Sequence, residues 1–202
     1  MPRVRIIFEK TDWFVFVNHM DLPTVFSRAA KRAGLAQEFT QGFSPHPHIS
    51  LAAPLAIGLD GYAEPADFWF VTWDNSSESA WNSYLPRGLK ILRSSEVDTD
   101  GPALGKVANA AAYEIVGLMS ALDKEGLDIL KDEVTKSGVL FDASISDGRI
   151  SLSVGGLEHC GAGNFVRALK TAGKCDGWSD LQMTRLLVGR WEPQVGKVVP
   201  LI

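Results

Sequence analysis

Gln41 to Gly58 read QGFSPHPHISLAAPLAIG, and this stretch decides how the first half of the chain folds. Its leading half contains a glycine and two prolines, which fix an irregular backbone path, so we expect a stiff loop that presents His46 and His48. Its second half is apolar and predicts a buried strand, in which Pro54 indicates a bulge or an edge position. The neighbouring elements are arranged around this loop and strand.

Strands and a helix are predicted before the loop. Residues 3–9, RVRIIFE, and 13–17, WFVFV, are rich in β-branched and aromatic residues and predict two strands or one bent strand. Asn18 stands where a helix cap belongs. The helix that follows should end at Arg32 or the alanine after it, because Gly34 is a typical helix terminator.

A hairpin partner, a short helix and a last strand are predicted after the loop. Residues 66–73, ADFWFVTW, are strongly β-prone, a short helix should begin at Ser76, and residues 89–97, LKILRSSEV, predict a strand. The resulting order is strand, helix, strand, strand, helix, strand. This is the split βαβ order of a ferredoxin-like unit.

The same order of elements is predicted again in the second half. Residues 98–110 lack strand character and predict a connection. The elements expected after it are a strand (112–119), a helix (122–138), a hairpin turning at Asp147-Gly148, a helix (163–173) and a strand (184–193). We therefore predict an α+β protein of two tandem ferredoxin-like units with antiparallel sheets, over residues 1–97 and 111–202.

Composition limits the classes of function. The chain has 202 residues, with 20 basic and 24 acidic side chains and a net charge of −4, which argues against a protein that coats duplex nucleic acid by bulk charge. The spacing of its two cysteines, Cys160 and Cys175, fits neither a disulfide scaffold nor a CxxC motif, so reduced thiols are expected. No apolar window is long enough to span a membrane. We expect a cytoplasmic protein that does not contact membranes.

One segment resembles a known family. The chain reads NHMDLPTVFSRAAKRAGLAQEFTQGFSPHPHISLAAPLAIG from Asn18 to Gly58, followed by GYAEPADF. These residues resemble the radical-SAM-associated (radical-SAM-linked) domain family of unknown function. That domain occurs alone or at the C-terminus of radical SAM proteins that have a cobalamin-binding region. The shared pattern joins an HxD segment to GFxPHP and a later ExxD.

The resemblance implies an accessory role in radical SAM chemistry, in the modification of RNA or of a cofactor. It implies that a radical SAM protein is the partner and that the cluster and the cobalamin belong to that partner, so we expect no intrinsic cofactor. The substrate-binding candidates, most of them matched to the family pattern, are Arg28, Arg32, Gln41, Phe43, His46, His48, Ser50, Glu64 and Asp67.

The histidines allow more than one interpretation. His46 and His48 stand two apart on extended backbone, so they could bind one metal ion with His19, Asp21 or Glu64. The alternative is that His46 fixes the loop by hydrogen bonds to backbone carbonyls. His19, Asp21 and His46 are also candidate acids and bases for RNA cleavage. Asp21 is equally explained as an acidic residue that stabilises the first turn of the helix.

Cations and aromatic residues suggest how RNA would be bound. Candidate phosphate contacts are Arg3, Arg5, Arg28, Lys31 and Arg32, although charged helix faces are usually only solvated. Trp69 and Trp73 alternate along a predicted strand, where they would stack unpaired bases or, more commonly, face the core.

These features predict a non-catalytic recognition module. It would hold RNA or another substrate for a radical SAM partner. The binding residues would come from the loop at 41–50 and the helix at 19–32. Two alternatives stay open, a metal-independent ribonuclease that uses His19 and His46, and a protein that carries a metal or cofactor.

Overall fold

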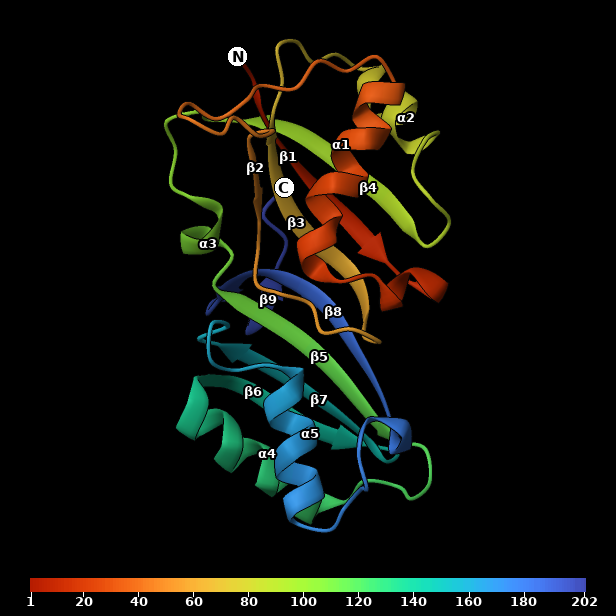
Figure 1. Ribbon diagram of the computed structural model, residues 1–202. Helices are drawn as coiled ribbons and strands as arrows, with labels where there is room; N and C mark the ends of the chain where they lie inside the picture. The colour runs from red at the N-terminus through yellow and green to blue at the C-terminus, as the bar shows by residue number, and fades with distance from the viewer. The chain divides into compact units, whose positions relative to one another are not determined.

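A computed structural model describes all 202 residues, and the chain divides into two compact units (Figure 1). Unit 1 comprises Met1–Ala108 with Leu201–Ile202, and unit 2 comprises Asn109–Pro200. Both units combine helices with antiparallel strands, which confirms the predicted α+β class. None of the helices combines the length and the apolar character that a membrane span requires.

Unit 1 contains a four-stranded antiparallel arrangement. Its strands follow the spatial order β4-β1-β3-β2. In chain order the elements are β1 (Arg3–Lys10), the 3-10 helices η1 (Asp12–Phe16) and η2 (His19–Asp21), α1 (Leu22–Arg32), β2 (Ile49–Leu51), β3 (Asp60–Trp69), α2 (Ser77–Asn82), β4 (Leu89–Val97) and α3 (Leu104–Val107).

The register of β1 and β3 separates an apolar from a polar sheet face. Val4 lies opposite Phe68, and Arg5 lies opposite Asp67. Because side chains alternate along a strand, the first pair faces one side and the second pair the other. Helices α1 and α2 cover the apolar side (Figure 1).

Aromatic side chains fill the core between α1, α2 and the sheet. Phe26 of α1 packs edge-on against Phe68, with ring centroids 5.3 Å apart, and Phe68 packs against Trp81 of α2 at 4.8 Å. The indole N–H of Trp81 donates to the carbonyl of Phe26 over 3.0 Å, so the one polar atom of this cluster is satisfied. This packing fixes which face of α1 points inward and which is left exposed.

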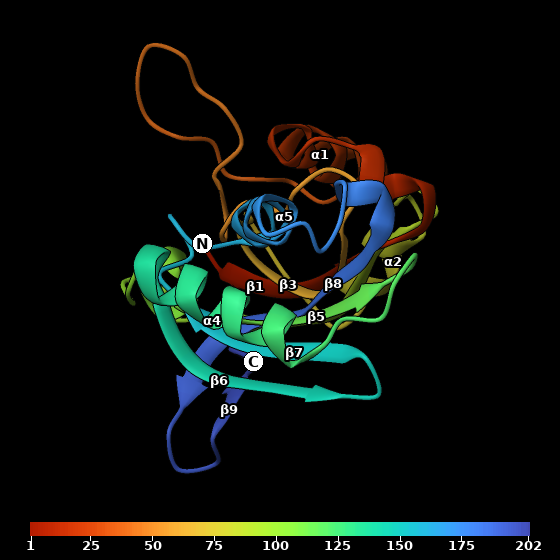
Figure 2. The ribbon, with the colours of Figure 1, turned by 90° about the horizontal axis from the view of Figure 1, so that it is seen from below.

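Unit 2 repeats the element order of unit 1. Its strands follow the order β8-β5-β7-β6, with β9 paired to the end of β8. The elements are β5 (Ala110–Gly117), α4 (Lys124–Ser137), β6 (Val139–Ser146), β7 (Arg149–Gly155), α5 (Ala162–Thr171), the 3-10 helix η3 (Trp178–Asp180), β8 (Leu181–Glu192) and β9 (Lys197–Val199). Helix α4 lies against α5 and β6 (Figure 2).

Several predicted elements are confirmed by their local geometry. Gly34 follows α1 with φ of +77°, a conformation that glycine adopts without strain. The hairpin between β6 and β7 turns at Asp147 and Gly148, whose φ values are +52° and +72°. Both residues therefore occupy the left-handed region that a tight hairpin turn requires.

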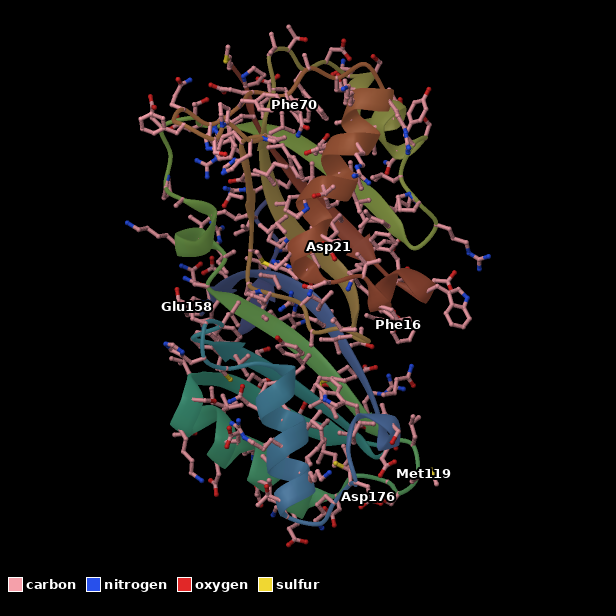
Figure 3. All side chains as sticks on the ribbon, in the orientation of Figure 1. Phe16, Asp21, Phe70, Met119, Glu158 and Asp176 are labelled. Atoms are coloured by element: carbon pink, nitrogen blue, oxygen red, sulfur yellow. The ribbon has the colours of Figure 1, made fainter.

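The strand predicted over 13–17 is wrong. Asp12 adopts φ of +54°, which turns the chain after β1, and Asp12–Phe16 form η1. Val15 is buried in this turn, and Phe16 projects outward with 62% of its surface exposed (Figure 3). High β-propensity is overridden here, because Lys10 inside the fold donates from Nζ to the carbonyl of Val15 over 2.9 Å.

Other predicted boundaries shift. The apolar run after the loop forms a strand only over Ile49–Leu51, and Pro54, which has no N–H to donate to a sheet, lies beyond the end of this strand. The strand predicted over 66–73 begins earlier, at Asp60, and ends at Trp69. The predicted connection contains α3, which lies against β2 and β3, and β9 was not predicted.

Candidate functional site: a groove between helix α1 and the proline loop

Residues 36–48, here called the proline loop, are anchored at both ends. The N–H of Glu38 donates to the carbonyl of Trp69 over 2.8 Å, and the N–H of His48 donates to the carbonyl of Glu38 over 2.8 Å. The N–H of Thr40 donates to the carbonyl of His46, again over 2.8 Å. These bonds tie the two arms of the loop to each other and to β3. Figure 2 shows the loop, in orange, extending beside α1.

His46 stabilises the loop by contacting the side chain of Thr40, and not the backbone carbonyls that were expected. Its Nδ1 lies 3.1 Å from the hydroxyl oxygen of Thr40, and its backbone N–H donates to the same oxygen over 3.2 Å. Gln41 and Phe43 lie beyond this contact at the tip, where both are exposed. The tip thus presents an amide and an aromatic ring to solvent.

A groove runs between the exposed side of α1 and the proline loop. It consists of two adjoining hollows of about 510 and 420 Å³, which share Ser27, Arg28 and Pro47. We call it the α1 groove. The first hollow is also lined by Met20, Pro23, Thr24, His46 and Ile49, and the second by Lys31, Leu35, Ala36, Gln37 and Phe39.

The rim of the α1 groove is cationic. Arg28 and Lys31 stand on it, both exposed and one helical turn apart, and no acidic residue occurs between Leu22 and Gln37. Arg32 is also exposed on α1 but does not line either hollow. The groove therefore combines mostly apolar walls with a positive edge.

Two buried polar atoms of the groove have no hydrogen-bond partner in the protein. They are the hydroxyl oxygen of Ser27 and the side-chain nitrogen Nε2 of Gln37. Leaving a buried polar group unpaired costs about 1–3 kcal/mol, and folded proteins seldom tolerate it. Both atoms are enclosed by protein and closed to solvent, so neither is an open contact for a molecule in the groove.

His48 points to a different place from His46. Its ring stacks on Trp69 with centroids 3.7 Å apart and an interplanar angle of 5°. The guanidinium of Arg3 lies 5.2 Å from the centre of the same indole. His48 therefore belongs to an aromatic stack on the polar sheet face and does not line the α1 groove.

Trp69 and Trp73 do not share one face of a strand, as was predicted, because β3 ends at Trp69. Trp73 packs on Phe70 instead, with centroids 4.9 Å apart, and joins the core under α2. The two indoles lie on opposite sides of the sheet and cannot form one stacking platform.

Asp67 is completely buried and forms ion pairs with two arginines. Its carboxylate lies 2.6 Å from Nη2 of Arg3 and 2.7 Å from Nε of Arg5. Arg3 also donates to the carbonyls of Asp98, Gly101 and Pro102 over 2.9–3.2 Å. These charges are satisfied inside unit 1, so Arg3 and Arg5 do not form the phosphate-binding face that was considered.

The other matched residues of β2 and β3 also lie within the fold. Glu64 is 3% exposed in β3, and Ser50 is half-buried in β2 opposite Asp67. The structure places them around the sheet, away from the hollows beside α1.

His19 and Asp21 do not join His46 in the groove. Nδ1 of His19 accepts the N–H of Leu55 over 3.5 Å, and Asp21 is exposed at the start of α1 (Figure 3). Asp21 makes no capping hydrogen bond; Asn18 caps η2 by accepting the N–H of Met20 over 3.0 Å. No three or more His, Cys, Asp or Glu side chains are grouped so that they could hold a metal ion.

Several groove residues were not singled out from the sequence. They include Met20, Thr24, Ser27, Gln37 and Phe39. A periodic signal existed: positions 24, 27 and 31 recur at helical spacing and share one side of α1. The spacing does not predict that the proline loop folds back over this side.

A family model matches residues 3–140 of the chain, and the family is described as "Uncharacterized protein conserved in bacteria (DUF2344)". The chain belongs to the DUF2344 family. The match contains every residue of the α1 groove and continues through β5 and α4. The region that matches the family therefore includes the α1 groove and part of unit 2.

Two solved structures are similar to this DUF2344 chain over most of its length. The regulatory subunit of aspartate kinase from Thermus thermophilus, in its ligand-free form, is 14% identical, with 85% of this chain and 93% of that chain covered and a TM-score of 0.27. A putative glycine cleavage system transcriptional repressor is 16% identical, with 91% and 98% covered and a TM-score of 0.24. No curated protein sequence matches the chain.

Proposed function

We propose that this DUF2344 chain is a recognition module that binds single-stranded RNA in the α1 groove for a radical SAM partner. The observation that supports it is the groove itself, with mostly apolar walls and a rim formed by Arg28 and Lys31. It is built from the segment that resembles the radical-SAM-linked family. The partner follows from that resemblance, and the cluster and cobalamin would belong to the partner.

RNA is the ligand whose chemistry fits this groove best. Unpaired bases stack on aromatic side chains while phosphates contact cations. Phe39 lies at the groove, 51% exposed, and Phe43 is fully exposed at the loop tip. The net charge of −4 does not oppose this mode, because a local cationic edge is enough for a single strand.

Recognition is better supported than RNA cleavage. General acid–base cleavage needs two groups within reach of one phosphate, and the ribonuclease alternative assigns these roles to His19 and His46. Only His46 lines the groove. His46 is therefore proposed as a contact to the ligand, and Gln41 and Phe43 as further contacts from the loop tip.

We also propose that the two units are tandem ferredoxin-like folds. The strand orders β4-β1-β3-β2 and β8-β5-β7-β6 support this, because both arise from the chain order strand, helix, strand, strand, helix, strand. In this arrangement, α1 and the proline loop form the connection between the first two strands of the first fold. The groove would then lie within the connection that joins the first two strands of a ferredoxin-like fold.

RNA binding can be tested by fluorescence anisotropy with labelled ten-nucleotide RNA at several salt concentrations. The wild type should bind at low salt, and Arg28→Ala/Lys31→Ala should weaken binding at least tenfold. Loss of two phosphate contacts should also reduce the slope of log K against log salt by about 1.4, at about 0.7 per contact on single strands.

The matched control is Lys90→Ala/Arg93→Ala, which removes one lysine and one arginine from exposed positions on β4. This control should bind RNA as the wild type does. No binding at low salt, or an equal effect of the two double variants, would contradict the proposal.

A further inference from the structure

We infer that the first hollow of the α1 groove is a subsite for a terminal phosphate of an RNA strand, held by Thr24, Arg28 and His46. The inference rests on the proposed function, because it specifies which part of the strand is bound there. It goes beyond contacts to internal phosphates, since these are the same at every position of a strand and do not distinguish its end.

Three exposed polar side chains line the first hollow, and they come from both of its sides. Thr24 and Arg28 belong to α1 and are four residues apart, so their side chains are neighbours on one side of the helix. His46 belongs to the proline loop on the other side of the groove. Because all three residues are exposed, a ligand in the hollow can reach each of them.

The charge of the first hollow favours an anion. Its lining contains one guanidinium group and one imidazole but no carboxylate, and the rest is mostly apolar. The guanidinium of Arg28 forms no ion pair within the protein, so its charge is available to a ligand. Asp21, the nearest acidic residue along the chain, lines neither hollow. Apolar walls reduce screening by water, which strengthens the attraction between an anion and these groups.

The contact between His46 and Thr40 orients the imidazole as a hydrogen-bond donor. The hydroxyl oxygen of Thr40 accepts the backbone N–H of His46 over 3.2 Å and lies 3.1 Å from Nδ1. With this oxygen already accepting, its hydrogen can be donated to Nδ1, which places the hydrogen of the neutral ring on Nε2. Nε2 can then donate to a phosphate oxygen, and a protonated ring donates from the same atom.

A terminal phosphate matches these donors better than an internal one. A phosphodiester within a strand has one negative charge, whereas a phosphate monoester has a charge of about −1.5 to −2 at pH 7 and three strong acceptor oxygens. The second hollow has no imidazole, and its cations, Arg28 and Lys31, stand at the rim. A strand whose end is held in the first hollow would therefore continue along this rim, past Phe39.

The test uses ten-nucleotide RNA of one sequence, labelled at an internal nucleotide, with a 5′-phosphate, with a 3′-phosphate or with hydroxyls at both ends. By fluorescence anisotropy, the wild type should bind one of the phosphorylated forms at least tenfold more tightly than the form with hydroxyl ends. One hydrogen bond to a charged group supports a ratio of this size. Comparison of the 5′ and 3′ forms shows which end of the strand is held.

Two conservative variants should each reduce this preference to threefold or less. Thr24→Val removes only the hydroxyl, and His46→Asn keeps a polar atom that can contact Thr40 but lacks Nε2. The matched controls make the same changes at exposed positions of unit 2, Thr135→Val on α4 and His159→Asn before α5. Both controls should keep the preference of the wild type, and thermal unfolding should show that all four variants are folded.

Each outcome decides a different statement. RNA binding that depends on Arg28 and Lys31 but is equal for the three forms overturns the terminal-phosphate subsite and leaves the proposed function intact. A preference that stays above threefold in either variant, or that falls equally in the matched controls, also overturns the subsite. Absence of binding to all three forms overturns both statements. If His46→Asn does not fold, the result for Thr24→Val decides the question.

Discussion

Asp67 is the last residue of the motif that resembles radical-SAM-linked domains, yet it is buried between two arginines. Arg3 donates to it from Nε and Nη2 over 2.9 and 2.6 Å, and Arg5 from Nε over 2.7 Å. A match to a family pattern therefore does not separate a residue that binds a ligand from one that maintains the fold. Burial in the structure distinguishes the two roles, and the sequence alone does not show that this carboxylate is buried.

Removing Asp67 should destabilise the protein strongly. Asp67→Ala leaves two buried guanidinium groups without their counter-charge, and breaking a buried ion pair costs about 3–5 kcal/mol. Urea unfolding at neutral pH measures this free energy. Asp100→Ala removes an exposed acid from the loop after β4; this control should change stability by less than about 0.5 kcal/mol. A loss below about 1 kcal/mol in Asp67→Ala would refute the structural role.

Gly88 offers a second test at the scale of one residue. It has φ of +85°, and an added Cβ would collide with the carbonyl of Thr11 and lie 2.9 Å from Cβ of Phe14. Gly196 has φ of +63° with nothing within 4 Å of such an atom. Gly196→Ala should therefore cost only the backbone strain, about 1–2 kcal/mol.

Gly88→Ala should cost roughly 1–3 kcal/mol more than Gly196→Ala, because the turn before β4 must also move. Urea unfolding of the two variants compares the costs directly. Equal losses of stability would show that the carbonyl of Thr11 does not approach residue 88 closely.

At the scale of elements, helix α4 begins at a charged cap that should make stability depend on pH. The pKa of Asp123 is lowered, first by the N–H of Gly126, which its carboxylate accepts over 2.8 Å, and then by Lys174. A lowered carboxyl pKa stabilises the fold above the pKa of the unfolded chain, about 3.9, and this contribution is lost as pH falls through the folded pKa.

Asp123→Asn keeps an acceptor for the cap but cannot titrate. Its melting temperature should fall less than that of the wild type between about pH 6 and pH 2. Asp132→Asn, at an exposed position of the same helix, is the control. The same pH dependence in Asp123→Asn as in the wild type would contradict the assigned role of this carboxylate.

Elements whose signals are local were predictable from sequence. Strand β4 is found at the predicted residues 89–97, because the Pro-Arg-Gly sequence before it ends the preceding helix. The run at 13–17 could not be predicted. It is β-prone, but its path is set by the left-handed Asp12 and by the buried ammonium group of Lys10, which are tertiary features.

At the scale of the whole molecule, the proposed site was predictable only in part. The sequence pointed to His46, Arg28 and the loop, because cations, prolines and histidines are visible without coordinates. It did not point to Ser27 or Gln37, because these residues line the groove only where the proline loop folds back over α1. It grouped His19 with His46, which the fold does not bring into one groove.

The central claim is that RNA occupies the α1 groove, and ultraviolet crosslinking followed by mass spectrometry of the full chain tests it most directly. Aromatic side chains stacked on bases crosslink well, so labelled ten-nucleotide RNA should attach mainly to peptides that contain Phe39 and Phe43. Arg28→Ala/Lys31→Ala should abolish these crosslinks, and Lys90→Ala/Arg93→Ala should leave them unchanged. Crosslinks that map to other surfaces, or that persist in Arg28→Ala/Lys31→Ala, would contradict the claim.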